Sequence, residues 1–525
     1  MNRKLRWSMA GQIALAMSLL LSACSSPNAA STPSSSPASG KAAEAVKAKP
    51  LTIALTGDAT SLDPQNASDS ISSLVTYQIF DRLVTFNDKL DIVPQLAESW
   101  THSKDGKEWT FQLRKGVKFQ DGTPLNAEAV KTSFERVADK SKKLSQYTLV
   151  GQFIDSITTN GESEVVFHLK APQAALLNNL AVSPSGILSP KSIKENEAGI
   201  SKNPVGTGPF QLKAWTPGNE LVLEPNPHYW GDKQQVSSVT FRTVPENSAR
   251  VIMLESGEAD VIEKVPNSEV ARLEKNSSLT VHSRLTNRVL YIGINTTNAP
   301  FNDVKVRKAL NAAIDRDTLI NKLYEGRVKP ATSFIAQHTF GYSNVGQYTF
   351  SPEQANQWLQ EAGVKPGTPL RIILAGNTVQ DRPAAEFVQN SLQKIGFKAE
   401  LKVLELGAYL EALKDPKNYD LFVRGASSTT GDADTLLRDS FFSTSTSNYA
   451  HYTNPEVDKL LKESGEQVNK EERQKLYATV QKIVKEDAPW IPLHEDLAYV
   501  GLSKKVQGIT FLPTLFWDLR NVKVQ

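Results

Sequence analysis

Leu370-Arg-Ile-Ile-Leu374, Lys398-Ala-Glu-Leu-Lys-Val403 and Tyr419-Asp-Leu-Phe-Val423 are three short runs, and an amphipathic segment from Ala384 to Ile395 separates the first two. Short runs rich in Leu, Ile and Val are typical of buried strands, whereas the longer segment, closed by Gly396, is typical of a helix. Strands that alternate with helices form a parallel sheet. Residues 370–424 therefore predict an α/β fold.

Strand-like runs continue on both sides of this unit. Leu51 to Leu55 and Trp109 to Arg114 alternate in the manner of strands, and the apolar run Arg288 to Asn295 predicts a buried one. Residues 50–525 are too many for one hydrophobic core, so we expect at least two domains. The tail from Ala498 to Gln525 returns to strand-like patterning, and we expect it to pair with the first region.

The first residues have the layout of a secretory signal. A basic start is followed by a short apolar stretch, Ile13 to Leu21, which ends at Leu21-Ser-Ala-Cys24. That tetrad resembles the lipobox of bacterial lipoproteins, and Cys24 is the only cysteine of the chain. The resemblance implies a signal peptide over 1–24, a lipid on Cys24 and a place on the outer face of the cytoplasmic membrane. An ordinary cleaved signal with a chance cysteine is the alternative.

The segment after Cys24 is dominated by Ser, Pro, Ala, Asn and Gly. Residues 25–49 carry too little apolar surface to offset the entropy of ordering, so they predict a flexible tether. Beyond residue 50 there is no apolar run of about 18 residues, the length that would indicate a membrane span.

Composition and motifs exclude several classes of function. The chain has 59 basic and 56 acidic residues, so no basic face for nucleic acid is indicated. A single cysteine excludes disulfides within the chain and thiolate metal sites. The chain has no phosphate loop, no pair of histidines at helical spacing and no Gly-x-Ser-x-Gly elbow. We therefore expect no cofactor, no metal site and no enzymatic activity.

Four blocks of the chain resemble family 5 (peptide/nickel type) of the solute-binding proteins of ABC importers. They are Ala97-Glu-Ser-Trp100 to Gly122, Asn203-Pro-Val-Gly-Thr-Gly-Pro-Phe210 with Asn226 to Gly231, Val306 to Arg316, and Asn454 to Leu460 with Ala488 to Pro492. The resemblance covers most of residues 50–525. It implies a two-lobed, periplasmic-binding-protein-like α/β fold (type II, large peptide-binding variant) in a monomer. Lobe I would be 50–287 with 493–525, and lobe II 288–492, with a ligand cleft between lobes that close by a hinge motion.

The loop from Arg424 to Asp434 carries the most information about the solute. In dipeptide- and oligopeptide-binding relatives it holds a Trp and an Asp that binds the peptide ammonium; here those positions are Ala426 and Thr429. The hydroxyl-rich version looks closest to the glutathione-binding branch. The ligand-binding residues that we predict are Thr60, Ser61, Ser428, Thr429, Thr430 and Asp432. Asp432 has a second interpretation, as the cap of a helix from Thr435 to Phe442.

These predictions leave several alternatives open. Arg382 and Arg424 are candidates to bind a carboxylate. A nickel or metal-chelate carrier of the same family is the alternative function, with His338 and His451 as single contacts. A secreted hydrolase, and a pheromone or chaperone-like peptide receptor on the same fold, are further alternatives. The partners expected are a short peptide or glutathione-like solute, the ABC permease subunits and the membrane.

Overall fold

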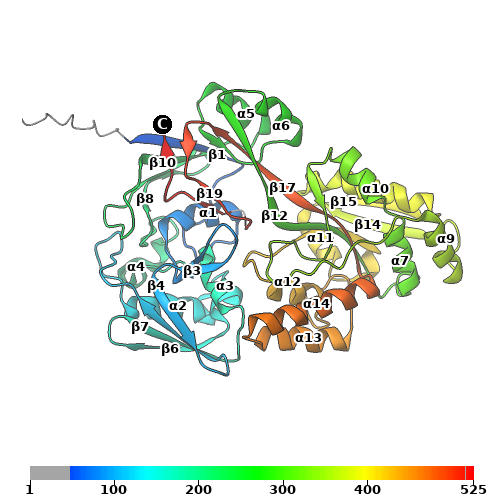
Figure 1. Ribbon diagram of the computed structural model, residues 1–525, viewed down its shortest axis with the longest axis horizontal. Helices are drawn as coiled ribbons and strands as arrows, with labels where there is room; N and C mark the ends of the chain where they lie inside the picture. Colours follow the sequence, from blue (N-terminus) through cyan, green and yellow to red (C-terminus); the bar gives the residue numbers. More distant parts are fainter. Residues whose placement is uncertain (1–47, 515) are drawn as a thin grey trace, which may run out of the picture. The chain divides into compact units, whose positions relative to one another are not determined.

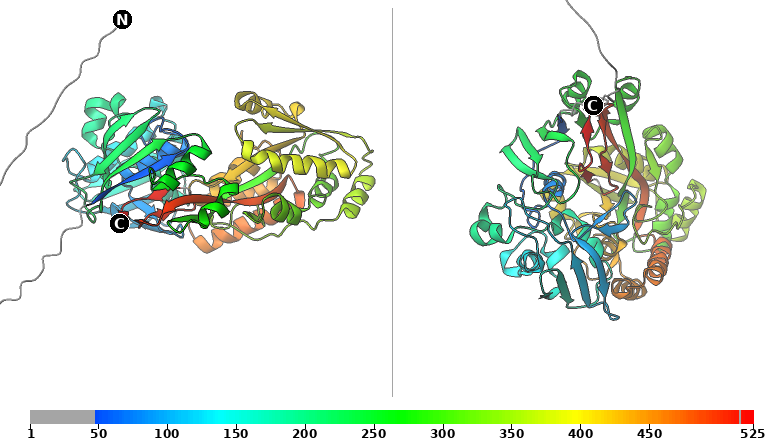
Figure 2. Two further views of the ribbon diagram at one scale, coloured as in Figure 1. Left: turned by 90° about the horizontal axis from the view of Figure 1, so that it is seen from above. Right: turned by 60° about the vertical axis from the view of Figure 1, so that its left-hand side comes forward.

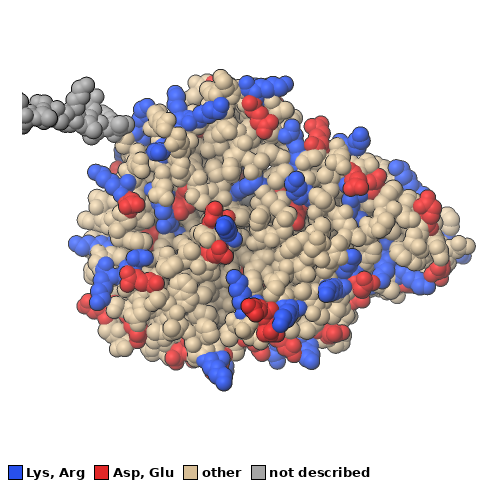
Figure 3. Space-filling view, in the orientation of Figure 1, with Lys and Arg blue, Asp and Glu red and all other residues tan. Residues whose placement is uncertain are grey.

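A computed structural model describes residues 48–514 and 516–525. The predicted signal peptide, Cys24 and residues 25–47 of the tether lie outside the described residues. Within the described part, no helix is long and apolar enough to cross a membrane. Figure 3 shows basic and acidic side chains interspersed over one face of the molecule, so that face carries no large patch of a single sign.

An 11-stranded sheet runs through the described structure in the order β15-β14-β16-β12-β17-β11-β1-β10-β9-β8, with β13 paired to β17. Its strands are β1 (Lys49–Leu55), β8 (Phe210–Thr216), β9 (Glu220–Pro225), β10 (Val236–Thr243), β11 (Val261–Ile262), β12 (Leu279–Ile294), β13 (Val328–Pro330), β14 (Pro369–Ala375), β15 (Lys398–Leu404), β16 (Leu421–Ser427) and β17 (Trp490–Ser503).

Two long antiparallel strands, β12 and β17, join the two halves of this sheet (Figures 1 and 2). Their register shifts between the pairs Leu285↔Leu497 and Val289↔Glu495, so that residues 286–288 of β12 face Asp496 alone. We call these four residues the crossing segment. The first half comprises 48–285 with 497–525, and the second half comprises 289–495.

The first half adds small sheets and helices to its part of the large sheet. The remaining strands are β2 (Val84–Phe86), β3 (Ile92–Pro94), β4 (Ala97–His102), β5 (Glu108–Leu113), β6 (Ile154–Asn160), β7 (Glu164–Leu169), β18 (Val506–Gln507), β19 (Thr510–Phe511), β20 (Trp517–Asp518) and β21 (Lys523–Val524). The helices are α1 (Ser70–Ile79), α2 (Ala127–Ala138), α3 (Leu176–Ala181), α4 (Pro190–Asn196), α5 (Asn247–Ser256) and α6 (Asn267–Glu274).

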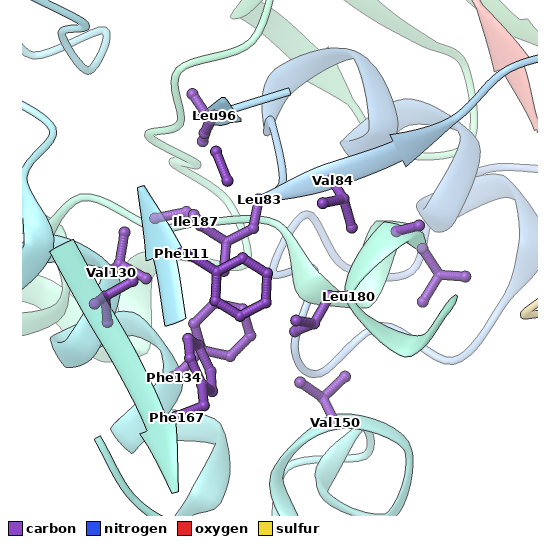
Figure 4. Close-up of a cluster of buried hydrophobic side chains, with 14 of the residues drawn as sticks. Leu83, Val84, Leu96, Phe111, Val130, Phe134, Val150, Phe167, Leu180 and Ile187 are labelled. Carbon is purple, nitrogen blue, oxygen red and sulfur yellow. The ribbon is translucent and has the colours of Figure 1, made fainter. Parts of the chain in front are cut away.

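Aromatic side chains fill the core beside the four-stranded sheet β4-β5-β7-β6 (Figure 4). The rings of Phe111 and Phe134 each meet Phe167 edge to face, with centroids 5.5 and 5.0 Å apart. They come from alternate, inward-facing positions of β5 and β7 and from the apolar side of α2, as the strand and helix periods require.

The second half contains the α/β unit that the sequence predicts. β14 is parallel to both β15 and β16, which confirms the parallel sheet. The helices of this half are α7 (Val304–Ala312), α8 (Arg316–Thr318), α9 (Pro352–Glu361), α10 (Arg382–Lys394), α11 (Leu406–Ala412), α12 (Ala433–Phe441), α13 (Pro455–Glu466) and α14 (Lys470–Asp487).

The hydrophobic interior follows the same division. Three clusters of buried side chains draw on residues 51–279 and 499–522, and three draw on residues 289–493. The C-terminal tail packs with the first half, and β17 pairs with β11, as expected from the tail's strand-like pattern. The lobe boundaries predicted at 287/288 and 492/493 stay a prediction.

Candidate functional site

The carboxyl ends of parallel strands from both halves point towards the crossing segment. β16 is antiparallel to β12, with Ser427 opposite Arg288, so the parallel strands β14, β15 and β16 all end near the crossing. In the first half β11 is antiparallel to β17 and parallel to β1, and these strands also run towards the crossing. Ligands of open α/β sheets bind beyond the carboxyl ends of the strands. The candidate site is therefore the zone between the two facing edges.

The loop after β16 is the best-defined part of this zone. Asp432 accepts a hydrogen bond from the Asp434 backbone N–H at 2.9 Å and thereby caps α12. The Arg473 guanidinium of α14 donates to both Asp432 carboxylate oxygens, at 2.6 and 2.8 Å. The Ser428 hydroxyl donates to the Asp432 carbonyl at 2.6 Å. Gly431 takes a positive φ of 67°, which glycine adopts without strain.

These contacts establish one of the two roles that the sequence leaves open for Asp432, the cap. Its side chain is buried, and both carboxylate oxygens are engaged by Arg473 and the α12 backbone. The structure thus supports the cap, through which Asp432 positions the loop, and ligand contact by Asp432 stays a prediction. Ser428 and Thr430 are also buried, whereas Thr429 is exposed. Ligand contact by these three residues stays a prediction.

Thr60 and Ser61 lie in the loop that follows β1. The Thr60 hydroxyl donates to Asp69 at 2.5 Å, and the Thr60 backbone N–H donates to the Ser72 hydroxyl at 2.8 Å. Ser61 accepts from the backbone of Asp63 at 3.1 Å. The predicted site residues of the two halves are thus held separately, since none of these hydrogen bonds links Thr60 or Ser61 to the 428–432 loop.

Other residues make the connection between the halves. The Asn178 side chain of α3 donates to the Thr430 carbonyl at 3.0 Å. Asn287 of the crossing segment donates to the Ser428 carbonyl. The Ala174 backbone N–H donates to the Gly465 carbonyl at 3.0 Å. Sequence reasoning missed these residues, because no local pattern marks a side chain that bonds to a backbone more than a hundred residues away.

An ion cluster occupies the edge of the second half at the crossing. Arg288 donates to Asp381, beside the start of α10, at 2.7 Å and to Asp496 at 2.5 Å. Burial raises the pKa of Asp381, and Arg288 offsets this only in part. Burial also acts to raise the pKa of Asp496, but hydrogen bonding from His494 and the charge of Arg288 outweigh it, and that pKa falls. The Arg288 guanidinium packs against Gly425, and a Cβ atom added at Gly425 would lie 2.1 Å from Arg288 Nε.

Buried polar atoms without a hydrogen-bond partner gather near the crossing. Such atoms are rare in folded proteins and are usually satisfied by water or by a ligand. In the described residues they belong to the side chains of Arg284, Tyr324, Arg327, Thr339, Glu495 and Thr514, among others. Burial raises the pKa of Glu495 to about 7, because only Gln337 donates to its carboxylate. The crossing thus has unused donors and acceptors of the kind that a polar solute would satisfy.

The other candidate residues have different surroundings. Arg382 is exposed and pairs with Glu386 at 2.8 Å, one helical turn along α10. Arg424 lies over the Tyr449 ring, 4.8 Å from its centroid. His451 approaches the Tyr419 hydroxyl at 3.0 Å. Among the described residues no three His, Cys, Asp or Glu side chains come together as metal ligands.

Comparison with known proteins places this fold and site in a family. Residues 91–448 match the family described as bacterial extracellular solute-binding proteins, family 5 Middle. The glutathione-binding protein GsiB of Escherichia coli O1:K1 / APEC is 30% identical over 490 residues, which cover 92% of this chain and 96% of that protein. GsiB of Salmonella choleraesuis (strain SC-B67) is 30% identical over 478 residues, covering 89% and 93%.

Solved structures give the same result. HbpA2 from Haemophilus parasuis superimposes with a TM-score of 0.83 at 28% identity, covering 91% of this chain and 100% of that one. The periplasmic binding protein DppA from Helicobacter pylori, in complex with peptide STSA, gives a TM-score of 0.76 at 30% identity, covering 90% and 98%. The fold is that of the two-lobed α/β periplasmic binding proteins, as the sequence predicts. The chain belongs to family 5 of the bacterial extracellular solute-binding proteins.

Proposed function

We propose that this protein is the lipid-anchored solute-binding component of an ABC importer, and that it captures a short peptide or a glutathione-like solute between its halves and delivers it to the permease. The observation that carries the proposal is the 427–432 loop. It lies at the carboxyl edge of one half, exposes Thr429, and is held from the other half by Asn178. A loop in this position senses whether the halves are closed over a solute.

The chemistry of the zone favours a polar, peptide-like solute. Backbone amides and carboxylates offer both donors and acceptors, which match the unpaired atoms of Tyr324, Glu495 and Thr514. GsiB is named as a glutathione-binding protein, and DppA is solved with a tetrapeptide. Both are binding proteins, and we expect this chain likewise to release its solute unchanged.

A thermal-shift screen of the purified protein tests the solute class. The ligands are glutathione, peptides of two to five residues, and nickel with and without histidine. A ligand present at about 100 times its Kd stabilises the folded state by about 2.7 kcal/mol, so a genuine solute raises the melting temperature. Mass spectrometry of the recovered ligand then shows whether it is intact. The proposal fails if nickel–histidine alone raises the melting temperature, or if the ligand is consumed.

The anchor needs a separate test, since it rests on the sequence around Cys24. We expect the wild-type protein to partition with the membrane fraction and Cys24→Ser to be lost from it, because the lipid would be attached through the thiol. Equal partitioning of the two forms would contradict the anchor without affecting the solute assignment.

A further inference from the structure

Arg284 is a half-buried cation without a counter-ion in the described structure. It lies on β12 opposite Ala498 of β17, just before the crossing segment. Its Nε and Nη1 atoms are buried and have no hydrogen-bond partner. No ion pair in the described structure involves it, and Asp88 and Asp518, which line a neighbouring cavity with His282 and Phe511, do not come within 4.0 Å of its charge. Burial lowers the pKa of Arg284 to about 10, with no acid to offset it.

Four buried arginines of the described structure have ion pairs or backbone partners, whereas two donor nitrogens of Arg284 have none. Arg136 and Arg473 form short ion pairs with Asp63 and Asp432. Arg307 and Arg316 donate to backbone carbonyls, with three such contacts each. A buried charge left unpaired is costly and is retained where something else pairs with it.

The side chain lies on the face of the β12–β17 ladder that is turned away from α5 and α6. Leu497 and Tyr499 of β17 pack with residues of α5 and α6. Arg284 is opposite Ala498, so it lies on the other face of the ladder, together with Asp496 of the crossing segment. On this face the guanidinium lies 5.8 Å from the centre of the Phe511 ring, onto which His282 also stacks. Phe511 packs against the Arg284 guanidinium and leaves the N–H donors of Arg284 unpaired.

We propose that Arg284 is the anion subsite of the solute-binding zone, where it pairs with a carboxylate of the bound solute. The planar guanidinium donates two parallel hydrogen bonds to a carboxylate, one from Nη2 and the other from Nε or Nη1, and the buried Nε–H and Nη1–H have no partner within the protein. The inference rests on the proposed function and sharpens it: the preferred solute carries a free carboxylate, and peptides whose C-terminus is amidated are poor ligands.

Isothermal titration calorimetry with glutathione, with the peptide Ser-Thr-Ser-Ala and with its C-terminal amide tests this subsite. For a probe that the wild type binds, we expect Arg284→Met to lower the affinity about 10- to 100-fold, as for loss of a hydrogen-bonded charge. Arg284→Lys retains the charge but not the paired N–H donors of the guanidinium, so its affinity should lie between those of the wild type and Arg284→Met. If the wild type binds Ser-Thr-Ser-Ala, its affinity for the C-terminal amide should be as low as the affinity of Arg284→Met for the free acid.

A stability measurement separates this role from a structural one. Without ligand, Arg284→Met removes an uncompensated buried charge, so its melting temperature should equal or exceed that of the wild type. A structural arginine would give the opposite shift. Arg272→Gln, at an exposed arginine of α6, is the matched control and should change neither quantity.

The outcomes are distinguishable from failure of the proposed function. If the wild type binds neither glutathione nor the peptide, the proposed function fails, and with it this inference. If the wild type binds a probe but Arg284→Met binds it equally well, or unfolds at a lower temperature, only the anion subsite is overturned.

Discussion

Breaking the ion pair beneath the 427–432 loop should cost more stability than removing any surface charge. Asp432→Asn keeps a side-chain oxygen for the α12 cap but loses the charge that faces Arg473. The guanidinium then loses its acceptor Oδ2 and the opposite charge, and it keeps only neutral acceptors: the amide oxygen, the Ser464 carbonyl at 2.9 Å and the Tyr477 hydroxyl at 2.8 Å. Its side chain is 5% exposed, so water cannot replace the lost partner.

The expected magnitude follows from this burial. Removing one member of a buried, hydrogen-bonded ion pair costs about 3–5 kcal/mol, because the other charge remains unpaired. Asp432→Ala should cost about 1 kcal/mol more, since the cap is lost as well. The double variant Asp432→Asn/Arg473→Met leaves no buried charge and should recover most of the loss. Arg382→Gln removes an exposed pair and should stay within about 0.5 kcal/mol of the wild type.

Guanidinium denaturation followed by circular dichroism measures these differences, and calorimetry shows whether the two halves unfold together. Asp432→Asn should also weaken solute binding, because Asp432 fixes the loop that exposes Thr429. A change of less than about 1 kcal/mol for Asp432→Asn, or a double variant no more stable than the single one, would refute the reasoning.

Three further predictions concern the crossing and the contact between the halves. Between about pH 4.5 and 7 the folded state keeps the proton of Glu495 while the unfolded state releases it. The free energy of unfolding therefore falls as the pH rises through this range, by at most about 3 kcal/mol. Glu495→Gln should remove this pH dependence from melting curves taken across the same range. Gly425→Ala should lower the free energy of unfolding by about 1–3 kcal/mol, because the added Cβ displaces Arg288 from Asp381 and Asp496. An unchanged midpoint of chemical denaturation would contradict the close contact between Gly425 and Arg288. Asn178→Ala removes one hydrogen bond between the halves and should speed solute dissociation about 2- to 10-fold in stopped-flow experiments; equal rates would argue that this contact does not hold the closed form.

The α/β unit of the second half was predictable because its signals are local. The apolar face and the closing glycine predict a helix over 384–395, and α10 spans Arg382–Lys394. The cap of α12 by Asp432 was likewise foreseen as one of two roles, since it depends on residues next to each other in the chain.

The rest of the site depends on distant partners. Asp432 meets Arg473 forty-one residues later, and Arg288 meets Asp496 across 208 residues. Periodicity carries no information about such pairs, because an arginine on a strand or helix has the same local pattern whether it is solvated or buried. Arg284 illustrates this: its sequence context is an ordinary polar strand, and only the fold shows that its surroundings lack an acid.

The long strands β12 and β17 have a consequence for attempts to divide the molecule. Each half takes a stretch of both strands into its sheet, and the first half is built from two separate stretches of the chain. A polypeptide ending near residue 285 would leave β11 without its neighbour β17 and would expose a hydrogen-bonding edge to aggregation. We expect the first half not to be recovered as an isolated soluble fragment, whereas a nick in an exposed turn such as that at Gly161 should leave both halves associated.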